Sequence, residues 1–392
     1  MADRKNQHFV PQYYFRFFSE NDTHISSILK RDGRLIPAAS IRGQCAGDNF
    51  YGSKELESFF STLESKHSRA HRAAIDVAWN AREDDFTAEE YRNLLELVTF
   101  QRSRTLLEIE KSSPAKSQIM LDMFRHHLVH SKHDGKEQMV EMIDGGAVKI
   151  TEHSKATVVR IIDVAMESVP LISDLEMLLL RNRTDYPFIF GDAPVIHYNT
   201  WARDVKDRGV LGTQCPGLQI FYPLDSGTCL VLFDPKKYSG PFGPYLQYDI
   251  HQRSDVSSIN ALQLYHSSRS IYFGPADCTD YVQQLWGVHK DSLVAPRTEY
   301  NSDANFWVDG KPPEGKLMHS FEPQLAYELN LSFFECNPVS RRDYTFCHRS
   351  PDLVAELDRQ RELQENREQG VRSSDRKVRR KSRRQRIRRL PK

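Results

Sequence analysis

The sequence predicts an α+β fold, in which a helical N-terminal half packs with antiparallel β hairpins in the C-terminal half. Over roughly the first 170 residues, apolar side chains recur three and four positions apart, as amphipathic helices require. Further along, the pattern changes to short runs of β-branched and aromatic residues bounded by Asn, Asp, Gly or Pro, which is typical of strands. Because the helices come first and do not alternate with the strands, the order favours α+β over α/β.

Three helices are expected in the first half. Residues 55–79 form one amphipathic stretch. Thr87 and Glu90 have the spacing of a capping box, in which each side chain bonds the other residue's backbone N–H, so a second helix should begin there. Ser113 and Pro114 mark a third start, because the first turn of a helix does not need the N–H that proline lacks.

Strands and one further helix are expected in the second half. The first two and the last two strands are predicted to form hairpins, and these strands cover residues 175–180, 187–190, 218–223 and 228–233. A helix is expected over 257–270, and a strand over 324–335 should close the folded part.

The chain is predicted to form one domain with an extension and a tail. No linker rich in Pro, Gly or Ser and no internal repeat divides residues 1–350, which we assign to a single α+β domain. A helical extension should cover 351–370, and a basic tail 371–392. The tail has too few apolar side chains to bury, so it should be disordered when free.

Charge is distributed unevenly between this tail and the rest of the chain. The tail carries twelve Lys or Arg and one acidic residue, a net charge of +11, whereas residues 1–370 carry 42 basic and 52 acidic residues. Such a tail is expected to bind nucleic acid or another polyanion, since each neutralised phosphate releases a counterion. Alternatively, it could fold back on the acidic body. The residues expected to contact the polyanion are Arg379, Arg380, Lys381, Arg383 and Arg384.

Several classes of protein are excluded by what the sequence lacks. No apolar run approaches the ~20 residues of a membrane-spanning helix, and the N-terminus has no apolar signal-peptide stretch. The six cysteines include no CxxC pair, so they are expected to be free thiols in a reducing compartment. Walker A, GxGxxG, GxSxG and HExxH motifs are absent. We expect a cytoplasmic protein, or a nucleoid or nuclear one if the tail targets nucleic acid.

The first group of candidate site residues lies near the N-terminus. His8, Gln12 and Arg16 are embedded among seven large apolar side chains in the stretch from Gln7 to Phe18. If Pro11 opens a helix, Gln12 and Arg16 are four apart and share one face. His8 could then be a metal ligand or general base and Arg16 a phosphate clamp, with Gln12 binding substrate. The alternative is a hydrogen-bonded structural cluster.

A second group combines two predicted helices. Gln101 continues the apolar stripe of the helix that begins near Thr87, and Arg104 lies three residues beyond it. An inward-pointing arginine needs a carboxylate or a phosphate as partner. Glu57 and Glu64 are seven apart on the preceding helix, hence on one face, and could supply that carboxylate. An internal ion pair and a shared site with substrate are both compatible with this pattern.

A third group lies in the second half. Asp192 follows an apolar strand and precedes a proline-enforced turn, where a carboxylate could bind a metal ion, act as a base or cap the turn. Asn260 and Gln263 are amides three apart on the later helix, and Asn260 is a candidate substrate contact. Arg125 and His130 fit the R-[N/D/H]-x-x-x-H signature of HEPN ribonucleases, which act on RNA without a metal. Residues five apart on a continuous helix point roughly 140° from each other, which opposes a shared site.

These segments together resemble a widespread microbial family catalogued as domain of unknown function 4238. The resemblance covers about residues 5–275 in order, and its most specific part is the N-terminal HFVPQxYxRxF signature from His8 to Phe18. Phe15 stands where the family usually has Leu, and Gly191 where Ser is usual. The other segments that carry the resemblance are Asn49–Tyr51 with the helix of Glu57 and Glu64 that follows, Phe100–Arg104, Gly191–Pro194 and Phe221–Leu224. Since the family has no established activity, the resemblance implies the fold boundary and the association of these segments, but no reaction.

The leading hypothesis is a metal-dependent phosphodiesterase or nuclease-type hydrolase that acts on nucleic acid with Mg²⁺ or Mn²⁺. The predicted metal ligands are Glu57, Glu64 and Asp192. His8 would be a ligand or base, while Arg104 and Arg16 would offset the phosphate charge. The alternatives are a non-enzymatic nucleic-acid-binding or scaffold protein, and a metal-free HEPN-like ribonuclease. The oligomeric state does not follow from the sequence.

Overall fold

The structure is a computed structural model that describes residues 6–48, 54–80, 86–150, 162–242, 247–274, 278–301, 319–363 and 366. The chain divides into two compact units, Met1–Phe346 and Cys347–Lys392. In the second unit, a helix covers 351–363, within the range of the predicted helical extension. The basic tail, 371–392, lies outside the described residues.

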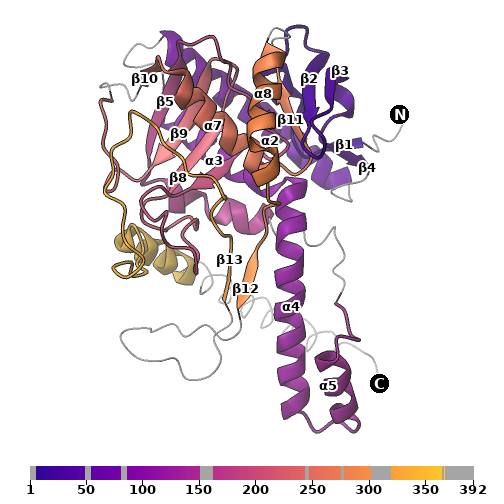
Figure 1. Ribbon diagram of the computed structural model, residues 1–392. Helices are drawn as coiled ribbons and strands as arrows, with labels where there is room; N and C mark the ends of the chain where they lie inside the picture. Colours follow the sequence, from indigo (N-terminus) through magenta and orange to yellow (C-terminus); the bar gives the residue numbers. More distant parts are fainter. Residues whose placement is uncertain are drawn as a thin grey trace, which may run out of the picture. The chain divides into compact units, whose positions relative to one another are not determined.

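A five-stranded mixed sheet forms the centre of the first unit (Figure 1). Its strands, in spatial order, are β10 (Gln247–Ile250), β5 (Glu176–Asn182), β9 (Thr228–Phe233), β8 (Gln219–Pro223) and β7 (Ile196–Tyr198). Strands β10 and β5 run parallel, and every other pair in this sheet is antiparallel. Every residue of β7, β8 and β9 is buried, because both faces of the sheet are covered.

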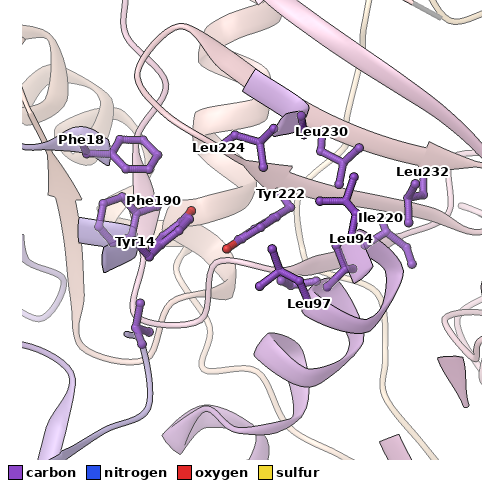
Figure 2. Close-up of a cluster of buried hydrophobic side chains, with 14 of the residues drawn as sticks. Tyr14, Phe18, Leu94, Leu97, Phe190, Ile220, Tyr222, Leu224, Leu230 and Leu232 are labelled. Carbon is purple, nitrogen blue, oxygen red and sulfur yellow. The ribbon is translucent and has the colours of Figure 1, made fainter. Parts of the chain in front are cut away.

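The two faces of this sheet belong to two separate hydrophobic cores, as the two-residue period of a strand requires. On β9, Leu230 and Leu232 point into one core, while Val231 and Phe233 point into the other. Figure 2 shows the first core, where Leu94 of helix α3 packs near Ile220, Leu230 and Leu232. The α-helices with residues in this first core are α1 (Gln12–Phe18), α2 (Lys54–Asn80) and α3 (Ala88–Ser103). The second core is formed with α7 (Arg253–His266) and with residues 329–333.

A second, four-stranded sheet is entirely antiparallel, and helix α8 (Thr279–His289) lies beside it (Figure 1). Its strands, in spatial order, are β3 (Leu35–Ser40), β2 (His24–Leu29), β11 (Ser270–Phe273) and β6 (Phe190–Gly191). Ile28 and Ile271 from this sheet form a third core with Val282 and Leu285 of α8.

The remaining elements are two short strand pairs and several helices. Strand β1 (Asn6–His8) pairs with β4 (Ala46–Asp48), and β12 (Glu299–Asn301) with β13 (His319–Phe321). The backbone N–H of Thr298 donates to Lys111 O at 3.2 Å, which joins the start of β12 to helix α4. The remaining helices are α4 (Leu106–His130), α5 (Lys136–Asp144), η1 (Ile41–Gly43), η2 (Val169–Ile172), η4 (Lys290–Ser292) and a short helix over 162–167.

The predicted α+β class is confirmed, and so are two of the three helices predicted in the first half. Helix α2 covers the predicted range, and the capping box is complete, because Thr87 Oγ1 accepts from Glu90 N while Glu90 accepts from Thr87 N. The predicted start at Ser113 and Pro114 is wrong. Helix α4 begins two turns earlier, because Thr105 Oγ1 caps it by accepting from Glu108 N, and Pro114 lies inside the helix.

Of the two predicted hairpins, the one formed by β8 and β9 is confirmed, whereas the pairing of 175–180 with 187–190 is wrong. Strand β5 pairs with β9 and β10, and β6 pairs with β11. Because β10 and β9 occupy the two edges of β5, residues 187–190 cannot pair with it. The strand predicted over 324–335 is also wrong, since this described segment makes only an isolated bridge, between Glu335 and Ser239.

Gly191→Ala is expected to lower the free energy of unfolding by about 1–3 kcal/mol, the usual cost of overpacking a core. A Cβ at Gly191 would lie 2.8 Å from Ser267 Cβ and 3.1 Å from Gln263 O, so α7 would have to move. Gly43→Ala is the matched control, because a Cβ there would meet nothing within 4 Å. Thermal or denaturant unfolding of both variants tests this expectation, and equal stability of the two would contradict it.

Candidate functional site

The N-terminal segment leads from a strand directly into a short helix that has a buried and an exposed side. His8 is paired with Ala46 in the β1–β4 ladder, and Pro11 caps α1 as predicted. Helix α1 buries Tyr14, Phe15 and Phe18 in the first core. Gln12 and Arg16 share one face, as predicted, and the Arg16 guanidinium donates to Gln12 Oε1 at 3.3 Å.

The imidazole of His8 lies beside this face. Its Nε2 is 3.1 Å from Arg42 O and 3.4 Å from Gln12 Nε2. Because a carbonyl oxygen can only accept, we assign the proton to Nε2, which makes Nδ1 the basic nitrogen of the neutral ring. The partly exposed His8 and Gln12 therefore lie next to the exposed Arg16 on the surface of the protein.

Arg104 lies buried beneath this surface, with its side chain 2% exposed. Its Nη1 is 2.8 Å from Glu64 Oε1, and its Nη2 donates to the carbonyl oxygen of His8. The guanidinium carbon also lies 4.9 Å from the centre of the Phe100 ring. The predicted pairing of Arg104 with a carboxylate of α2 is thus confirmed for Glu64.

Gln101 lies one turn before Arg104 on the same face of α3. Its side chain hydrogen-bonds to the backbone carbonyl that follows that of His8, which is the carbonyl of Phe9. Its Nε2 donates to Phe9 O at 3.0 Å. Two consecutive carbonyl groups, those of His8 and Phe9, are therefore fixed by two side chains of α3. We call these two hydrogen bonds, from Arg104 to His8 O and from Gln101 to Phe9 O, the bracket. The bracket sets the position of the His8 ring relative to Glu64.

Glu57 and His71 lie seven residues to either side of Glu64 on α2. The side chain of Glu57 lies outside the described residues. His71, which the sequence analysis missed, is fully buried and stacks on Phe17 with ring centres 4.3 Å apart. Its Nε2 lies 2.7 Å from Leu224 O, and burial lowers its pKa to about 4, so the ring is neutral. The seven-residue repeat was the signal that could have found it.

Three tyrosines complete the buried side of this region. Tyr14 and Tyr222 stack with ring centres 5.2 Å apart, with their hydroxyls pointing to opposite sides (Figure 2). The Tyr14 hydroxyl donates to Pro223 O at 2.6 Å, whereas the Tyr222 hydroxyl is buried without a hydrogen-bond partner. Burial, and then the nearby charge of Glu64, raises the pKa of Tyr13. Tyr222 was missed as a site residue, although the Phe221–Leu224 segment contributed to the family resemblance.

Asp192 belongs to a different hydrogen-bond network. One carboxylate oxygen accepts from Ser268 N at 2.7 Å, and the other accepts from Arg269 N at 2.7 Å and Ser270 N at 3.3 Å. Burial is the largest influence on the carboxyl group and raises its pKa, while these three N–H groups act in the opposite direction. In this geometry Asp192 ties the end of β6 to the loop between α7 and β11.

The two amide side chains of α7 that the sequence singled out, Asn260 and Gln263, also form hydrogen bonds with backbone groups. Asn260 Oδ1 accepts from Ile189 N at 3.0 Å, and its Nδ2 donates to Pro187 O at 2.8 Å. Gln263 Oε1 accepts from Gly191 N at 3.0 Å. Both amides therefore form hydrogen bonds with buried backbone groups in and just before β6, where the four-stranded sheet approaches α7.

The described part of the chain does not assemble a site for a divalent metal ion. Within it, no three His, Cys, Asp or Glu side chains gather where they could hold a metal ion. Glu64 is bonded to Arg104, and the Asp192 oxygens are occupied by backbone N–H groups. Glu57 as a ligand stays a prediction, because its side chain lies outside the described residues.

The HEPN-like residues lie on the second half of α4. Arg125 donates to both carboxylate oxygens of Asp144, at 2.6 and 2.9 Å, and this pair joins α4 to α5. His130 Nδ1 lies 2.8 Å from His126 O, one turn earlier. Because α4 is continuous from Leu106 to His130, the two residues are held at the unfavourable five-residue spacing.

Three further expectations concern the chain as a whole. No helix in the described ranges is long and apolar enough to cross a membrane. All six cysteines are free thiols, as predicted. The tail residues predicted to contact a polyanion lie outside the described residues, and these are Arg379, Arg380, Lys381, Arg383 and Arg384.

Comparison with known protein families gives a match over most of the chain. The model of a family described as "Protein of unknown function (DUF4238)" matches residues 6–277. This range contains the N-terminal segment, helices α1–α4, both larger sheets and α7. Neither the curated proteins nor the solved structures contain a match to the chain.

Arg104→Met is expected to lower the free energy of unfolding by about 3 kcal/mol, because it leaves Glu64 without its cation and the buried His8 carbonyl without its donor. The control is Arg16→Met, which removes an exposed arginine from the same region. Denaturant unfolding measures both. An Arg104→Met protein as stable as the Arg16→Met protein would contradict the buried bracket.

Acidification is expected to destabilise the protein through His71. Since the folded pKa of about 4 is below the ordinary value of 6.5, protons bind the unfolded chain more readily, and stability falls as the pH drops from 6.5 toward 4. This one group should remove about 2 kcal/mol between pH 7 and pH 5. We expect His71→Phe to flatten the dependence of unfolding free energy on pH by that amount, and an unchanged slope would argue against a neutral, buried His71.

Proposed function

The chain belongs to the DUF4238 family, and from its own residues we propose that it is a hydrolase that cleaves phosphodiester bonds of nucleic acid. The proposed site is the His8 surface, which we define as the side chains of His8, Gln12, Arg16 and Glu64. The observation that carries the proposal is their convergence: residues from β1, α1 and α2 meet over a buried arginine that fixes the backbone of His8.

His8 is proposed as the general base. Its Nε2–H donates to Arg42 O, which orients the ring, and Nδ1 would take the proton from an attacking water or hydroxyl. The attacking oxygen forms a bond to phosphorus, the bond to the leaving oxygen breaks, and a proton is returned to that oxygen. Arg104 is a positioning residue in this scheme, because Glu64 and the His8 carbonyl already occupy its guanidinium.

The charge around the His8 surface suits a polyanion. Arg16, Arg42 and Arg72 are exposed on the elements that border it, and Arg72 lies 5.4 Å above the Phe17 ring. The carboxylate of Glu64 is offset by Arg104, so it does not cancel these exposed charges. Arg16 would offset the phosphate charge during reaction, and the basic tail 371–392 would hold the rest of the polyanion.

A second candidate function is binding of nucleic acid without catalysis. The observation that favours it is that several predicted site side chains in the described part of the chain make their hydrogen bonds to the protein's own backbone. This holds for Gln101, Asp192 and Asn260, which bond to Phe9, to Ser268–Ser270 and to Pro187 and Ile189. In that case, the tail alone would provide the affinity.

The test is cleavage of mixed RNA and DNA substrates by the full chain, by His8→Gln and by His133→Gln. Glutamine at position 8 keeps a donor for Arg42 O but lacks a basic nitrogen, so we expect turnover to fall by about 100-fold or more. His133 is an exposed histidine outside the site, and its variant should retain full turnover. Wild-type turnover in His8→Gln would contradict the proposed base.

The same assay, run with Mg²⁺ or Mn²⁺ and with EDTA, separates the alternatives. Turnover that needs a metal and disappears in Glu57→Gln would support the predicted metal ligands in place of a metal-free reaction. Turnover that survives EDTA and disappears in His130→Ala would favour a metal-free HEPN-like ribonuclease. Absence of cleavage, with binding that is lost in a variant ending at Gly370, would favour the binding protein.

A further inference from the structure

A second cluster of charged side chains, separate from the His8 surface, lies where α3, α4 and α7 meet the segment after β13. Arg102 Nη2 donates to Glu322 Oε2 at 2.5 Å, and Lys111 Nζ donates to the same oxygen at 2.7 Å. The Lys111 side chain is 2% exposed and that of Arg102 14%. Two cations therefore converge on one carboxylate oxygen in a place that largely excludes water.

A buried histidine faces the other oxygen of this carboxylate. His266 Nδ1 lies 2.9 Å from Ala193 O and must carry the proton of a neutral ring, since the carbonyl can only accept. Its Nε2 then presents a lone pair, is buried without a hydrogen-bond partner, and lies 3.9 Å from Glu322 Oε1. Burial, and then Arg102 and Lys111, lowers the pKa of His266 to about 3, which keeps the ring neutral.

The Glu322 carboxylate therefore provides a hydrogen-bond partner for Arg102 and Lys111 but not for His266. It accepts from both cations, but it has no proton to give to His266 Nε2, so two acceptors face each other. Lys111 has a second partner, Glu108 Oε2 at 2.6 Å, and the Arg102 guanidinium also reaches Val195 O at 3.4 Å. The neighbouring His197 donates from Nδ1 to Leu211 O and is likewise neutral, because burial lowers its pKa.

The cations and the carboxylate also differ in where they lie along the chain. Arg102, Lys111 and His266 lie within residues 6–277, the range that matches the family, whereas Glu322 lies beyond it. The Glu322 side chain is 16% exposed, so it has a route to solvent. Gln324 nearby anchors the backbone of this segment, by accepting from Asn199 N and donating to Ala202 O.

We infer that Arg102, Lys111 and His266 form a phosphate-binding site that Glu322 fills as an internal anionic ligand. A monoprotonated phosphate has oxygens to accept from Arg102 and Lys111, as the carboxylate does. It also has a P–OH group, which can donate to His266 Nε2. The phosphate therefore satisfies all three side chains, and the carboxylate only two. Inorganic phosphate and the terminal phosphate of a nucleotide share this chemistry.

The test compares the wild type with Glu322→Gln in about 10 mM phosphate and in chloride of equal ionic strength. Without phosphate, Glu322→Gln should melt lower, because Arg102 loses its carboxylate partner and Lys111 loses one of its two. Phosphate should restore its melting temperature by several degrees and bind, by calorimetry, at least about tenfold tighter than to the wild type. Adding Lys111→Met should abolish both effects, and Glu328→Gln, at an exposed pair with Arg203, should resemble the wild type.

The inference is overturned if phosphate stabilises Glu322→Gln no more than chloride does, or if the gain persists with Lys111→Met. Should Glu322→Gln fail to fold, Glu322→Asp keeps the charge but withdraws the carboxylate by one methylene, and phosphate should then bind tighter than to the wild type. Equal affinity would overturn the inference.

Titration with a nucleoside 5′-monophosphate separates the two sources of phosphate. Binding tighter than that of inorganic phosphate indicates that the site takes the phosphate end of a nucleotide, and weaker binding indicates that it takes the free ion. Because none of these readouts measures hydrolysis, the inference does not depend on the proposed function.

Discussion

The buried guanidinium of Arg104 is the constraint on which the proposed site depends. A charge removed from water must be paired and hydrogen-bonded, and here the partners are Glu64 of α2 and the carbonyl of His8. Three segments that are distant in the sequence must therefore meet at one point. Gln101 adds a second bond one turn away, to Phe9 O, so the segment before α1 cannot shift without breaking both. The position of the His8 ring follows from this bracket.

The five-stranded sheet gives the bracket a rigid support. Because β8 and β9 are buried on both faces, helices α1, α2 and α3 are pressed against one side of the sheet and α7 against the other. Two polar networks lie around this sheet, one centred on Arg104 and one on Glu322. Helix α3 contributes to both, since Arg102 and Arg104 lie two residues apart and point to different partners. One short stretch of α3 therefore organises two separate charged clusters.

Local signals in the sequence predicted those features that depend on neighbouring residues. The capping box at Thr87, the length of α2 and the shared face of Gln12 and Arg16 are all decided within a few turns. That Arg104 could pair with a carboxylate of α2 was also predictable, because a buried arginine needs a carboxylate or a phosphate as partner, but the choice of Glu64 over Glu57 was not. The pairing of β6 with β11 could not be predicted, since it is decided by contacts 80 residues apart, such as Gly191 with Ile271. For the same reason, the cluster around Glu322 was missed: no local pattern links position 322 to Arg102 and Lys111.

A double-mutant cycle between Arg104 and Glu64 tests the central claim most directly. The unfolding free energies of the wild type, Arg104→Met, Glu64→Gln and the double variant give the coupling between the two side chains. If this buried pair holds the N-terminal segment against α2 and α3, the coupling should be about 2 kcal/mol or more. Effects that add to within about 0.5 kcal/mol would mean that the two side chains act independently, and would contradict the account.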